Sequence, residues 1–352
     1  MEKLKFAGMV LAAGYSSRMG KLKPLLPIAG KSAVRHLTDS FYNAGVSKVF
    51  VVTGHGREEI EPHVRDAITV FNPDYSEGMI TSIKAGLREA LKYDWDGIMF
   101  TPVDHAIIRP YMLKLLMREF TPEAEQVVFP TFNGRRGHPP LISRGIAQKL
   151  CELEGPWGAK RFLFSQGDAA SDVEVGSPDM FADMDTPEDY EKLKDIYARK
   201  APTAVECEYM LKAERTPDRA ADHCRAVAER AIGLAEDAMF AGYKLDRDVV
   251  LAAAMLHDIK RVEPDHALAG ALVLKENGFP FVAQAIAEHM DLPDKRVQHI
   301  NESSIVYLAD KLTDGVEYVS LEERLATMPD QKRLYGEPKI RKAMSIYNLI
   351  YK

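Results

Sequence analysis

Short apolar segments that alternate with helical patterns constrain the fold of the first half of this 352-residue chain more than any other feature. Four segments are typical of buried strands, at residues 6–13, 48–53, 97–101 and 126–130. Between them lie helical patterns, at residues 33–44, 82–93 and 109–119. Short apolar strands separated by helices predict an α/β fold, a mostly parallel sheet with helices on both faces. Sheets of this kind bind ligands beyond the carboxyl ends of their strands.

The character of the sequence changes after about residue 190. A closing helix is expected at residues 190–199, and a linker at residues 200–217, a mixed stretch with two prolines and no clear period. From residue 218 onward nearly every stretch predicts helix and no β pattern is visible. The clearest helical stretches are residues 249–256, 267–276 and 303–312. We therefore expect an α/β domain over residues 1–199 and an all-α helical bundle over residues 218–352.

The composition argues against some classes of partner. The net charge is -6, so bulk electrostatics give no reason to expect nucleic acid or an anionic membrane. Binding of phosphate must then come from local basic groups, backbone amides or metal ions. The three cysteines, Cys151, Cys207 and Cys224, match no zinc or redox spacing, which indicates a reducing, cytoplasmic location. No run of about 18 apolar residues is present, so no membrane span is expected.

The strongest local signal follows the first predicted strand directly, as LAAGYSSRMGKLKPLLP over residues 11–27. Small side chains at Ala12 and Ala13 let the backbone approach a planar base, and Gly14 permits a tight loop whose amides can point at phosphate oxygens. Arg18 and Lys23 supply fixed positive charge for a triphosphate. The bland alternative is a strand-to-helix turn with solvated basic residues, but the whole string is far more specific than a glycine-rich loop. It fits neither the dinucleotide-binding GxGxxG pattern nor the P-loop.

This string resembles the pattern LAAGxSxRMGxxKxLLP of the glycosyltransferase-A-like (GT-A-like) nucleotidyltransferases, and most of all the molybdenum cofactor cytidylyltransferases. The resemblance spans roughly residues 5 to 195, because further family motifs follow in order. They are Asn72 before GMITS at residues 78–82, Asp104 after the third strand, GHPP at residues 137–140 and DMDTPED at residues 183–189. The resemblance implies a Rossmann-like sheet and the transfer of a nucleotidyl group to a phosphorylated acceptor, with release of pyrophosphate.

Residues that match the family motifs are implied to share the family roles. Nucleotide binding is implied for Leu11, Ala12, Ala13, Gly14, Ser16, Arg18, Lys23 and Ser82, and acceptor binding for Gly78, Met79, Gly137, His138 and Pro139. Both reactants are anionic, so the enzyme must hold them in line and neutralise charge. Arg18 and Lys23 would neutralise the triphosphate. A Mg²⁺ held by Asp104 and by Asp183 or Asp185 would bridge phosphate oxygens.

The sequence leaves the second Mg²⁺ ligand open and gives an expectation for the nucleotide. Asp185 could merely cap the helix that begins near Pro187, and the sequence does not separate it from Asp183. The Ala12–Ala13 pair resembles the pyrimidine-using branches, so CTP is the expected donor.

The sequence departs from the family on the acceptor side. His105 and Ala106 follow Asp104 where an acidic-Gln-Pro segment is common, and the family's GDxGAR segment reads GPWGAK at residues 155–160. These changes leave nucleotidyl transfer in place and bear on molybdopterin as the acceptor. A sugar or polyol phosphate is the alternative acceptor.

Histidines and aspartates in the helical half form an ordered set, H…HD…H…H…D. Its members are His223, His257, Asp258, His266, His289 and Asp310. Adjacent residues on a helix point about 100° apart, yet His257 and Asp258 can still converge on one metal ion lying between them. Imidazole and carboxylate ligands suit Mn²⁺, Fe²⁺, Zn²⁺ or Ni²⁺ in preference to Ca²⁺. The alternative is a set of unrelated core and surface histidines, and His266 could simply start a helix.

This order resembles the HD phosphohydrolase superfamily over about residues 218–318. The resemblance implies a first divalent ion held by His223, His257, Asp258 and Asp310, with His266 and His289 added in the binuclear branch. Such an ion lowers the pKa of a bound water toward 7 and places it in line with a phosphoester or phosphoanhydride, with Asp258 central to catalysis. Lys260 or Lys311 could offset charge on the substrate. Many relatives read HDIGK, whereas here Lys260 follows Ile259 directly. A nucleotide-sensing HD domain without turnover is the competing hypothesis.

Overall fold

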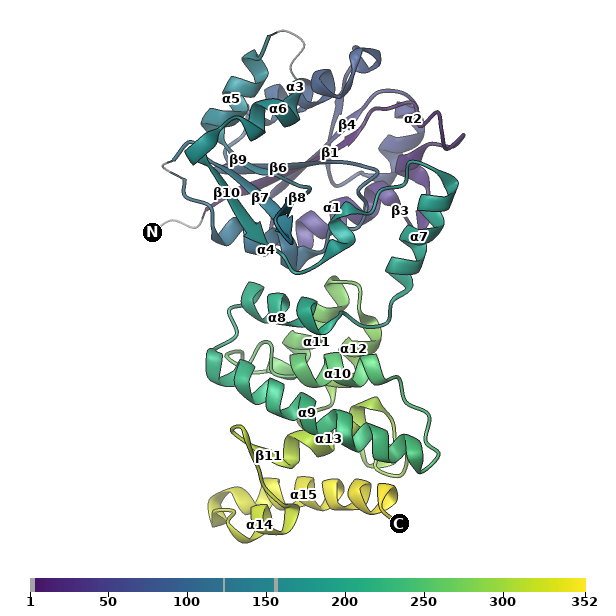
Figure 1. Ribbon diagram of the computed structural model, residues 1–352, viewed down its shortest axis with the longest axis vertical. Helices are drawn as coiled ribbons and strands as arrows, with labels where there is room; N and C mark the ends of the chain where they lie inside the picture. Colours follow the sequence, from purple (N-terminus) through teal and green to yellow (C-terminus); the bar gives the residue numbers. More distant parts are fainter. Residues whose placement is uncertain (1–3, 123, 155–157) are drawn as a thin grey trace. The chain divides into compact units, whose positions relative to one another are not determined.

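The computed structural model describes residues 4–122, 124–154 and 158–352. The chain divides into two compact units, Met1–Ala198 and Arg199–Lys352. They are coloured purple to teal and green to yellow in Figure 1.

The first unit is built on a mostly parallel sheet. Its strands are β1 (Phe6–Ala12), β4 (Lys48–Thr53), β5 (Ile68–Phe71), β6 (Gly97–Pro102), β7 (Val127–Phe132), β8 (Arg135–Arg136), β9 (Leu141–Ser143) and β10 (Ala170–Glu174). Their order is β10-β7-β9-β6-β1-β4-β5, with β8 paired to β7. The central strand β1 is buried along its whole length and runs parallel to both β4 and β6, whereas β9 is antiparallel to β6 and β7. The loops that leave β1 and β6 therefore emerge side by side at the carboxyl edge of the sheet.

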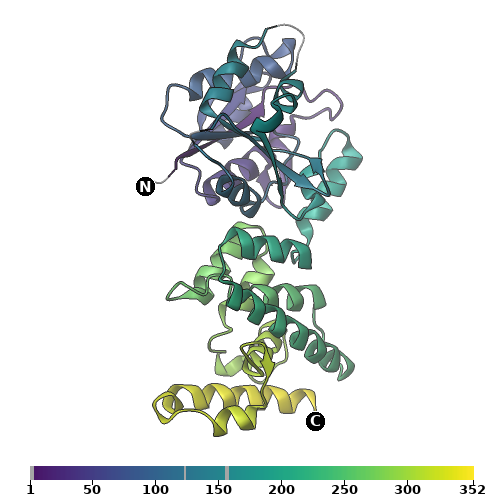
Figure 2. The ribbon, with the colours of Figure 1, turned by 60° about the vertical axis from the view of Figure 1, so that its left-hand side comes forward.

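Helices cover both faces of this sheet, as Figures 1 and 2 show. One face carries α1 (Ala33–Asn43), α4 (Pro110–Arg118) and α7 (Pro187–Ala198), and the other carries α3 (Met79–Ala90), α5 (Arg144–Glu152) and α6 (Ala159–Phe164). The packing is close enough that Gly8 in β1 lies against Phe41 of α1, where an added Cβ would come within 2.6 Å of the ring. The predicted α/β architecture is confirmed. A short helix α2 (Arg57–Ile60) and a small hairpin of β2 (Pro27–Ile28) and β3 (Lys31–Ser32) complete the main elements.

The second unit is helical, as expected. Its helices are α8 (Ala204–Ala213), α9 (Asp218–Phe240), α10 (Arg247–Leu256), α11 (His266–Glu276), α12 (Pro280–Ala287), α13 (Glu302–Lys311), α14 (Leu321–Ala326) and α15 (Asp330–Ile350). α10 packs against α8, α9, α12 and α13 and so forms the centre of the bundle. Every residue of α10 from Val249 to Leu256 except Leu251 is buried. This burial explains why the helix has an apolar, alanine-rich sequence.

Two features of the second unit differ from the sequence-based expectation. Helix α8 occupies most of the stretch expected as a linker. Thr203 and Glu206 form a capping box at its start. The side chains of Cys207, Met210 and Leu211 are buried, which anchors the helix. A hairpin of β11 (Thr313–Asp314) and β12 (Glu317–Tyr318) follows α13, although no β pattern was visible. Strands of two residues are too short to give a readable alternation.

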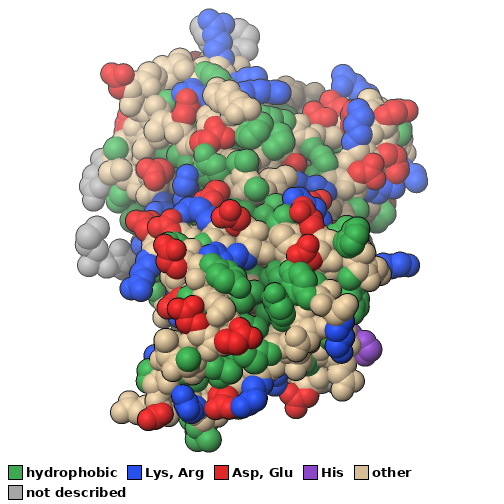
Figure 3. Space-filling view, turned by 60° about the horizontal axis from the view of Figure 1, so that its bottom comes forward, with side chains coloured by type: hydrophobic (Ala, Val, Ile, Leu, Met, Phe, Trp, Pro, Cys, Tyr) green, Lys and Arg blue, Asp and Glu red, His purple; other side chains and the backbone are tan. Residues whose placement is uncertain are grey.

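The surface carries both charges in mixture. Acidic and basic side chains are interspersed among hydrophobic ones on the face that Figure 3 shows. Among the described residues, no helix combines the length and the apolar character needed to cross a bilayer.

Candidate active sites

The loop after β1 folds back on itself and places Lys23 at the carboxyl edge of the sheet. The hydroxyl of Ser16 accepts the backbone N–H of Lys23 at 3.0 Å, and the carbonyl of Ser16 accepts the N–H of Met19 at 3.0 Å. Ser16 has a φ of 55°, a left-handed conformation that allows this tight return. Lys23 then begins a short 3-10 helix, with Pro24 next in sequence fixing the direction of the chain.

Lys23 joins two of the three carboxylates that the sequence offered as candidate metal ligands, Asp104 and Asp185. Its Nζ lies 2.5 Å from Oδ1 of Asp185 and 3.4 Å from Oδ2 of Asp104. The hydrogen bond from Lys23 lowers the pKa of Asp185. Arg18 reaches the same carboxylate, with Nη1 3.3 Å from Oδ2 of Asp185, from an otherwise exposed position. Residues more than 160 positions apart in the sequence thus meet at one point.

Asp104 has the character expected of a ligand for a hard cation. Its Oδ1 is buried and has no hydrogen-bond partner in the described part of the chain. A bare carboxylate oxygen at the end of a buried strand fits Mg²⁺, which takes one or two protein carboxylates and completes its shell with water and phosphate. Asp183 lies in the same region but forms no ion pair with Lys23 among the described contacts.

Two pockets meet at Asp104. The first, of about 290 Å³, is lined by Leu11, Ala12, Ala13, Gly14, Ser16, Lys23, Pro24, Tyr75, Gly78, Met79, Ser82, Pro102, Val103 and Asp104. The second, of about 400 Å³, includes Met79, Asp104, His105, Gly137, His138, Lys160, Asp183 and Asp185. Leu11, Met79, Pro102 and Asp104 line both pockets.

Of the residues predicted for the nucleotide, all but Arg18 line the first pocket, and of those predicted for the acceptor, Met79, Gly137 and His138 line the second. Gly78, expected to contact the acceptor, lines the first pocket instead. Arg18 and Pro139 line neither pocket, and Arg18 approaches the site through Asp185.

Ser82 is held in place by a buried amide. Nδ2 of Asn72 donates to the hydroxyls of Ser82 and Thr81, each at 2.9 Å. Because Ser82 accepts this bond, its own hydroxyl proton is available to a group in the first pocket.

The second pocket combines two imidazoles with cations that lie on aromatic rings. His105 and His138 have ring centroids 4.8 Å apart, and Nδ1 of each is buried with no hydrogen-bond partner among the described residues. Burial lowers the pKa of His138 to about 4, so the ring is neutral near pH 7. The guanidinium groups of Arg135 and Arg136 stack on Phe181 and Phe129 at 4.2 and 4.3 Å. The sequence noted His105 only as a departure. Lys160 lines the pocket, while residues 155–157 of the altered GPWGAK segment lie outside the described residues.

In the second unit, three histidines share one local arrangement. Nδ1 of His257 contacts the carbonyl of Ala254 at 2.8 Å, and Nδ1 of His289 contacts that of Ile286 at 2.7 Å. Nδ1 of His223 contacts the carbonyl of Gly315 at 2.7 Å. A carbonyl accepts an N–H, so in the neutral form of the His257 and His289 rings the lone pair lies on Nε2, whereas Nε2 of His223 is hydrogen-bonded to Asp310 at 3.1 Å. The bond from Nδ1 to a carbonyl is the outer hydrogen bond that metal-binding histidines usually make.

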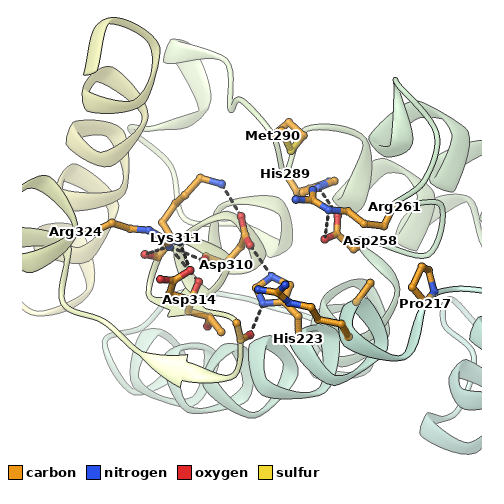
Figure 4. Close-up of a pocket in the computed structure, with 14 residues that line it drawn as sticks. Pro217, His223, Asp258, Arg261, His289, Met290, Asp310, Lys311, Asp314 and Arg324 are labelled. Atoms are coloured by element: carbon orange, nitrogen blue, oxygen red, sulfur yellow. Dashed lines mark hydrogen bonds and ion pairs between the residues drawn. The ribbon is translucent and has the colours of Figure 1, made fainter. Parts of the chain in front are cut away.

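All six residues predicted for the helical site converge. They include two groups of three donor atoms, and within each group the atoms lie within 4.8 Å of one another. The first group comes from His223, His257 and Asp258, and the second from Asp258, His266 and His289. Oδ1 of Asp310 lies 3.1 Å from Nε2 of His223 and 3.7 Å from Nε2 of His257. Figure 4 shows His223, Asp258, His289 and Asp310 facing one another across the pocket.

His257 and Asp258 are in the protonation states that bind metal. Nε2 of His257, Nε2 of His289 and Oδ1 of Asp258 are buried without a hydrogen-bond partner in the described chain. Burial lowers the pKa of His257 to about 4. Burial alone would raise the pKa of Asp258, but the neighbouring His289, His257 and Arg261 hold it below its usual range. Neutral imidazole and ionised carboxylate are the forms that ligate a cation, so these residues fit a divalent metal ion.

The pocket around this cluster has a volume of about 600 Å³ and a cationic lining, of which the sequence analysis named only Lys311. Arg219, Arg261, Lys311 and Arg324 line it. Nη1 of Arg324 is already bonded to the carbonyls of Asp310, Lys311 and Thr313 at the end of α13. Lys260, considered for the substrate, pairs with Glu214 instead and is absent from the lining residues.

The fold and the two sites define a two-domain protein in which an α/β nucleotidyltransferase fold is followed by a helical domain with a histidine–aspartate centre. Residues 8–170 match the family described as MobA-like NTP transferase domain, and residues 220–314 match the HD domain. The chain therefore carries a MobA-like NTP transferase domain followed by an HD domain.

Relatives resemble the first unit. Molybdenum cofactor cytidylyltransferase of Escherichia coli (strain K12) is 29% identical over 194 residues, which cover 54% of this chain and 95% of that protein. A protein named probable molybdenum cofactor guanylyltransferase of Bacillus cereus (strain AH187) is 28% identical over 195 residues, covering 53% and 94%. The crystal structure of Rv0371c from Mycobacterium tuberculosis H37Rv aligns with a TM-score of 0.48 and 24% identity, over 55% of this chain and 98% of that one.

Proposed function

We propose that the first unit transfers a cytidylyl group from CTP to a phosphorylated acceptor, with molybdopterin as the first candidate. The observation that carries this proposal is the meeting of two pockets at Asp104, where Lys23 also joins Asp104 to Asp185. A transferase needs one pocket for the donor and one for the acceptor, with charge neutralisation where they touch.

The reaction follows from this geometry. An oxygen of the acceptor phosphate attacks the α-phosphorus of CTP, the bond from that phosphorus to the bridging oxygen breaks, and pyrophosphate leaves. Lys23 faces the triphosphate from the first pocket and offsets its charge. When bound at Asp104, with Asp185 or Asp183 as second carboxylate, Mg²⁺ supplies further charge neutralisation. His105, His138 and the rim of arginines in the second pocket orient the acceptor.

The choice of CTP rests on Ala12 and Ala13, which line the first pocket. The relatives include a cytidylyltransferase and proteins named as guanylyltransferases at nearly equal identity, so the base must be tested directly. Pyrophosphate release is measured with CTP, GTP, ATP and UTP against molybdopterin and, separately, a sugar or polyol phosphate. Release with CTP and molybdopterin alone supports the proposal. Preference for GTP overturns the donor, and release only with a sugar or polyol phosphate overturns the acceptor.

For the second unit, we propose a metal-dependent phosphohydrolase. The buried, unpartnered donor atoms of His257, Asp258 and His289 support a bound divalent ion such as Mn²⁺, Fe²⁺, Zn²⁺ or Ni²⁺. The cationic lining supports a phosphorylated substrate. When bound, the ion supplies an activated water for attack on phosphorus. Residues Arg261 and Lys311 hold the phosphate, and a cavity of about 600 Å³ is of the size that holds small-molecule ligands.

This second proposal is tested with the variants His257→Ala and Asp258→Ala. Metal content and hydrolysis of phosphomonoester and phosphodiester substrates are measured for each variant and for the unaltered chain. Loss of both metal and hydrolysis supports an enzyme. Equal residual hydrolysis in variants and unaltered chain removes the enzymatic function and leaves a nucleotide sensor.

A further inference from the structure

The two groups of donor atoms in the HD centre differ in their surroundings. Arg261 lies against the second group, formed by Asp258, His266 and His289. Its Nη1 is 3.3 Å from Nε2 of His266, and its Nε is 3.5 Å from Oδ2 of Asp258. Figure 4 shows the Arg261 side chain beside Asp258. One side chain thus contacts two of the three residues that would bind a second ion.

Arg261 reaches the first group only through Oδ2 of the shared Asp258, and among the described contacts it has none with the imidazoles of His223 and His257. The donors of the first group are Nε2 of His223, Nε2 of His257 and the carboxylate of Asp258, with Oδ1 of Asp310 beside them. Lys311 pairs with the other oxygen of Asp310, Oδ2, at 2.5 Å. That contact leaves Oδ1 of Asp310 directed at the two imidazoles.

A guanidinium and a metal ion cannot share the second group. The lone pair on Nε2 of His266 accepts an N–H of Arg261, so an ion can take this lone pair only after the guanidinium leaves. Arginine cannot relieve the conflict by losing its proton, because a guanidinium stays protonated in proteins. Because its side chain is 52% exposed, Arg261 can swing outward at a modest cost, but a nearby unit of positive charge still opposes a divalent ion.

We propose that Arg261 takes the place of a second metal ion, so that the HD centre holds a single divalent ion in the first group. The inference rests on the proposed metal centre and deepens it. The guanidinium then presents fixed positive charge to a phosphate oxygen on the side of the pocket where a second ion would otherwise stand. Its planar set of donors suits two phosphate oxygens at once.

The test counts bound ions in the full-length chain. The protein is stripped with a chelator, reloaded with Mn²⁺ and freed of unbound ion, and manganese per chain is measured by mass spectrometry. Asp258→Asn removes the carboxylate that both groups share and serves as the baseline, so any ion in the first unit cancels. Arg261→Gln removes the charge at nearly constant length. Arg219→Gln is the matched control, because Arg219 lines the same pocket but makes no hydrogen bond or ion pair with the six donors among the described residues.

We expect one ion above the baseline for the unaltered chain and for Arg219→Gln, and two for Arg261→Gln. Electron paramagnetic resonance gives an independent readout, since a spin-coupled pair of Mn²⁺ ions is expected only in Arg261→Gln. Two ions in the unaltered chain, or one in Arg261→Gln, would overturn the role of Arg261 while leaving the metal centre in place. No ion above the baseline would overturn the metal centre itself and this inference with it.

Discussion

Replacing Lys23 by alanine tests the proposed transferase site most directly. Lys23 is the cation at the junction of the two pockets, with 13% of its side chain exposed, and it contacts both Asp104 and Asp185. Removing one group that stabilises transition-state charge typically lowers kcat by about 10²- to 10³-fold, or roughly 2.7–4 kcal/mol. We expect a loss of this size in the rate of CTP-dependent pyrophosphate release.

The same change should cost little stability, which separates the two effects. Asp185 is 43% exposed, so its ion pair with Lys23 is partly screened and contributes at most about 1 kcal/mol. Lys21 lies two positions earlier in the same loop and is exposed, so Lys21→Ala is the matched control. It should keep nearly full activity. The reasoning is refuted if Lys23→Ala releases pyrophosphate at the rate of the Lys21→Ala chain while both chains melt normally.

Three further predictions concern stability. Chelation of metal should lower the melting temperature of the second unit, because a ligand at about 100 times its dissociation constant stabilises the folded state by about 2.7 kcal/mol; in a His257→Ala chain, calorimetry should show no such shift. Burial lowers the pKa of His36 below its ordinary 6.5, so the unfolded chain takes up this proton at a higher pH than the folded chain. The stability of the first unit should therefore fall as pH drops below 6.5, and thermal melts between pH 7.5 and 5.5 should be flatter for His36→Gln. Finally, Asn301→Ala removes the capping box of α13 and should cost about 1 kcal/mol in urea denaturation, whereas an unchanged midpoint would show that the cap contributes nothing.

The buried strands could be predicted because they are continuous apolar runs. β1, β4 and β6 lie in the middle of the sheet, covered on both faces, and their sequences are nearly free of polar residues. The edge strands β5 and β10 were not predicted, because they are only partly buried and mix polar with apolar residues. Helix α8 was not predicted for a similar reason, because its buried residues are interleaved with charged and partly exposed ones.

The candidate metal ligands could be named from the sequence because their side chains carry the chemistry, and the six histidines and aspartates of the HD centre do converge. The groups that surround these ligands could not be predicted from the sequence. Arg261 is one of many surface-type cations in the sequence, and its contact with His266 depends on how the loop after α10 folds back to α11. His105 became notable only when its ring was seen beside His138.

The orientation of the histidine rings in the HD centre can likewise be predicted from the sequence for some residues and not for others. The last carbonyls of a helix lack partners within it, so a histidine at or just past the end can turn Nδ1 back onto the carbonyl three residues earlier. His257 and His289 do this at the ends of α10 and α12, so their position in the sequence already favours a free Nε2. His223 lies inside α9, where such carbonyls are occupied, and must take its partner from elsewhere. The hairpin after α13 supplies it, because Gly315, at a φ of 60°, makes the turn that brings its carbonyl to Nδ1 of His223. A hairpin whose strands are only two residues long, which the sequence does not reveal, therefore directs Nε2 of His223 toward Asp310.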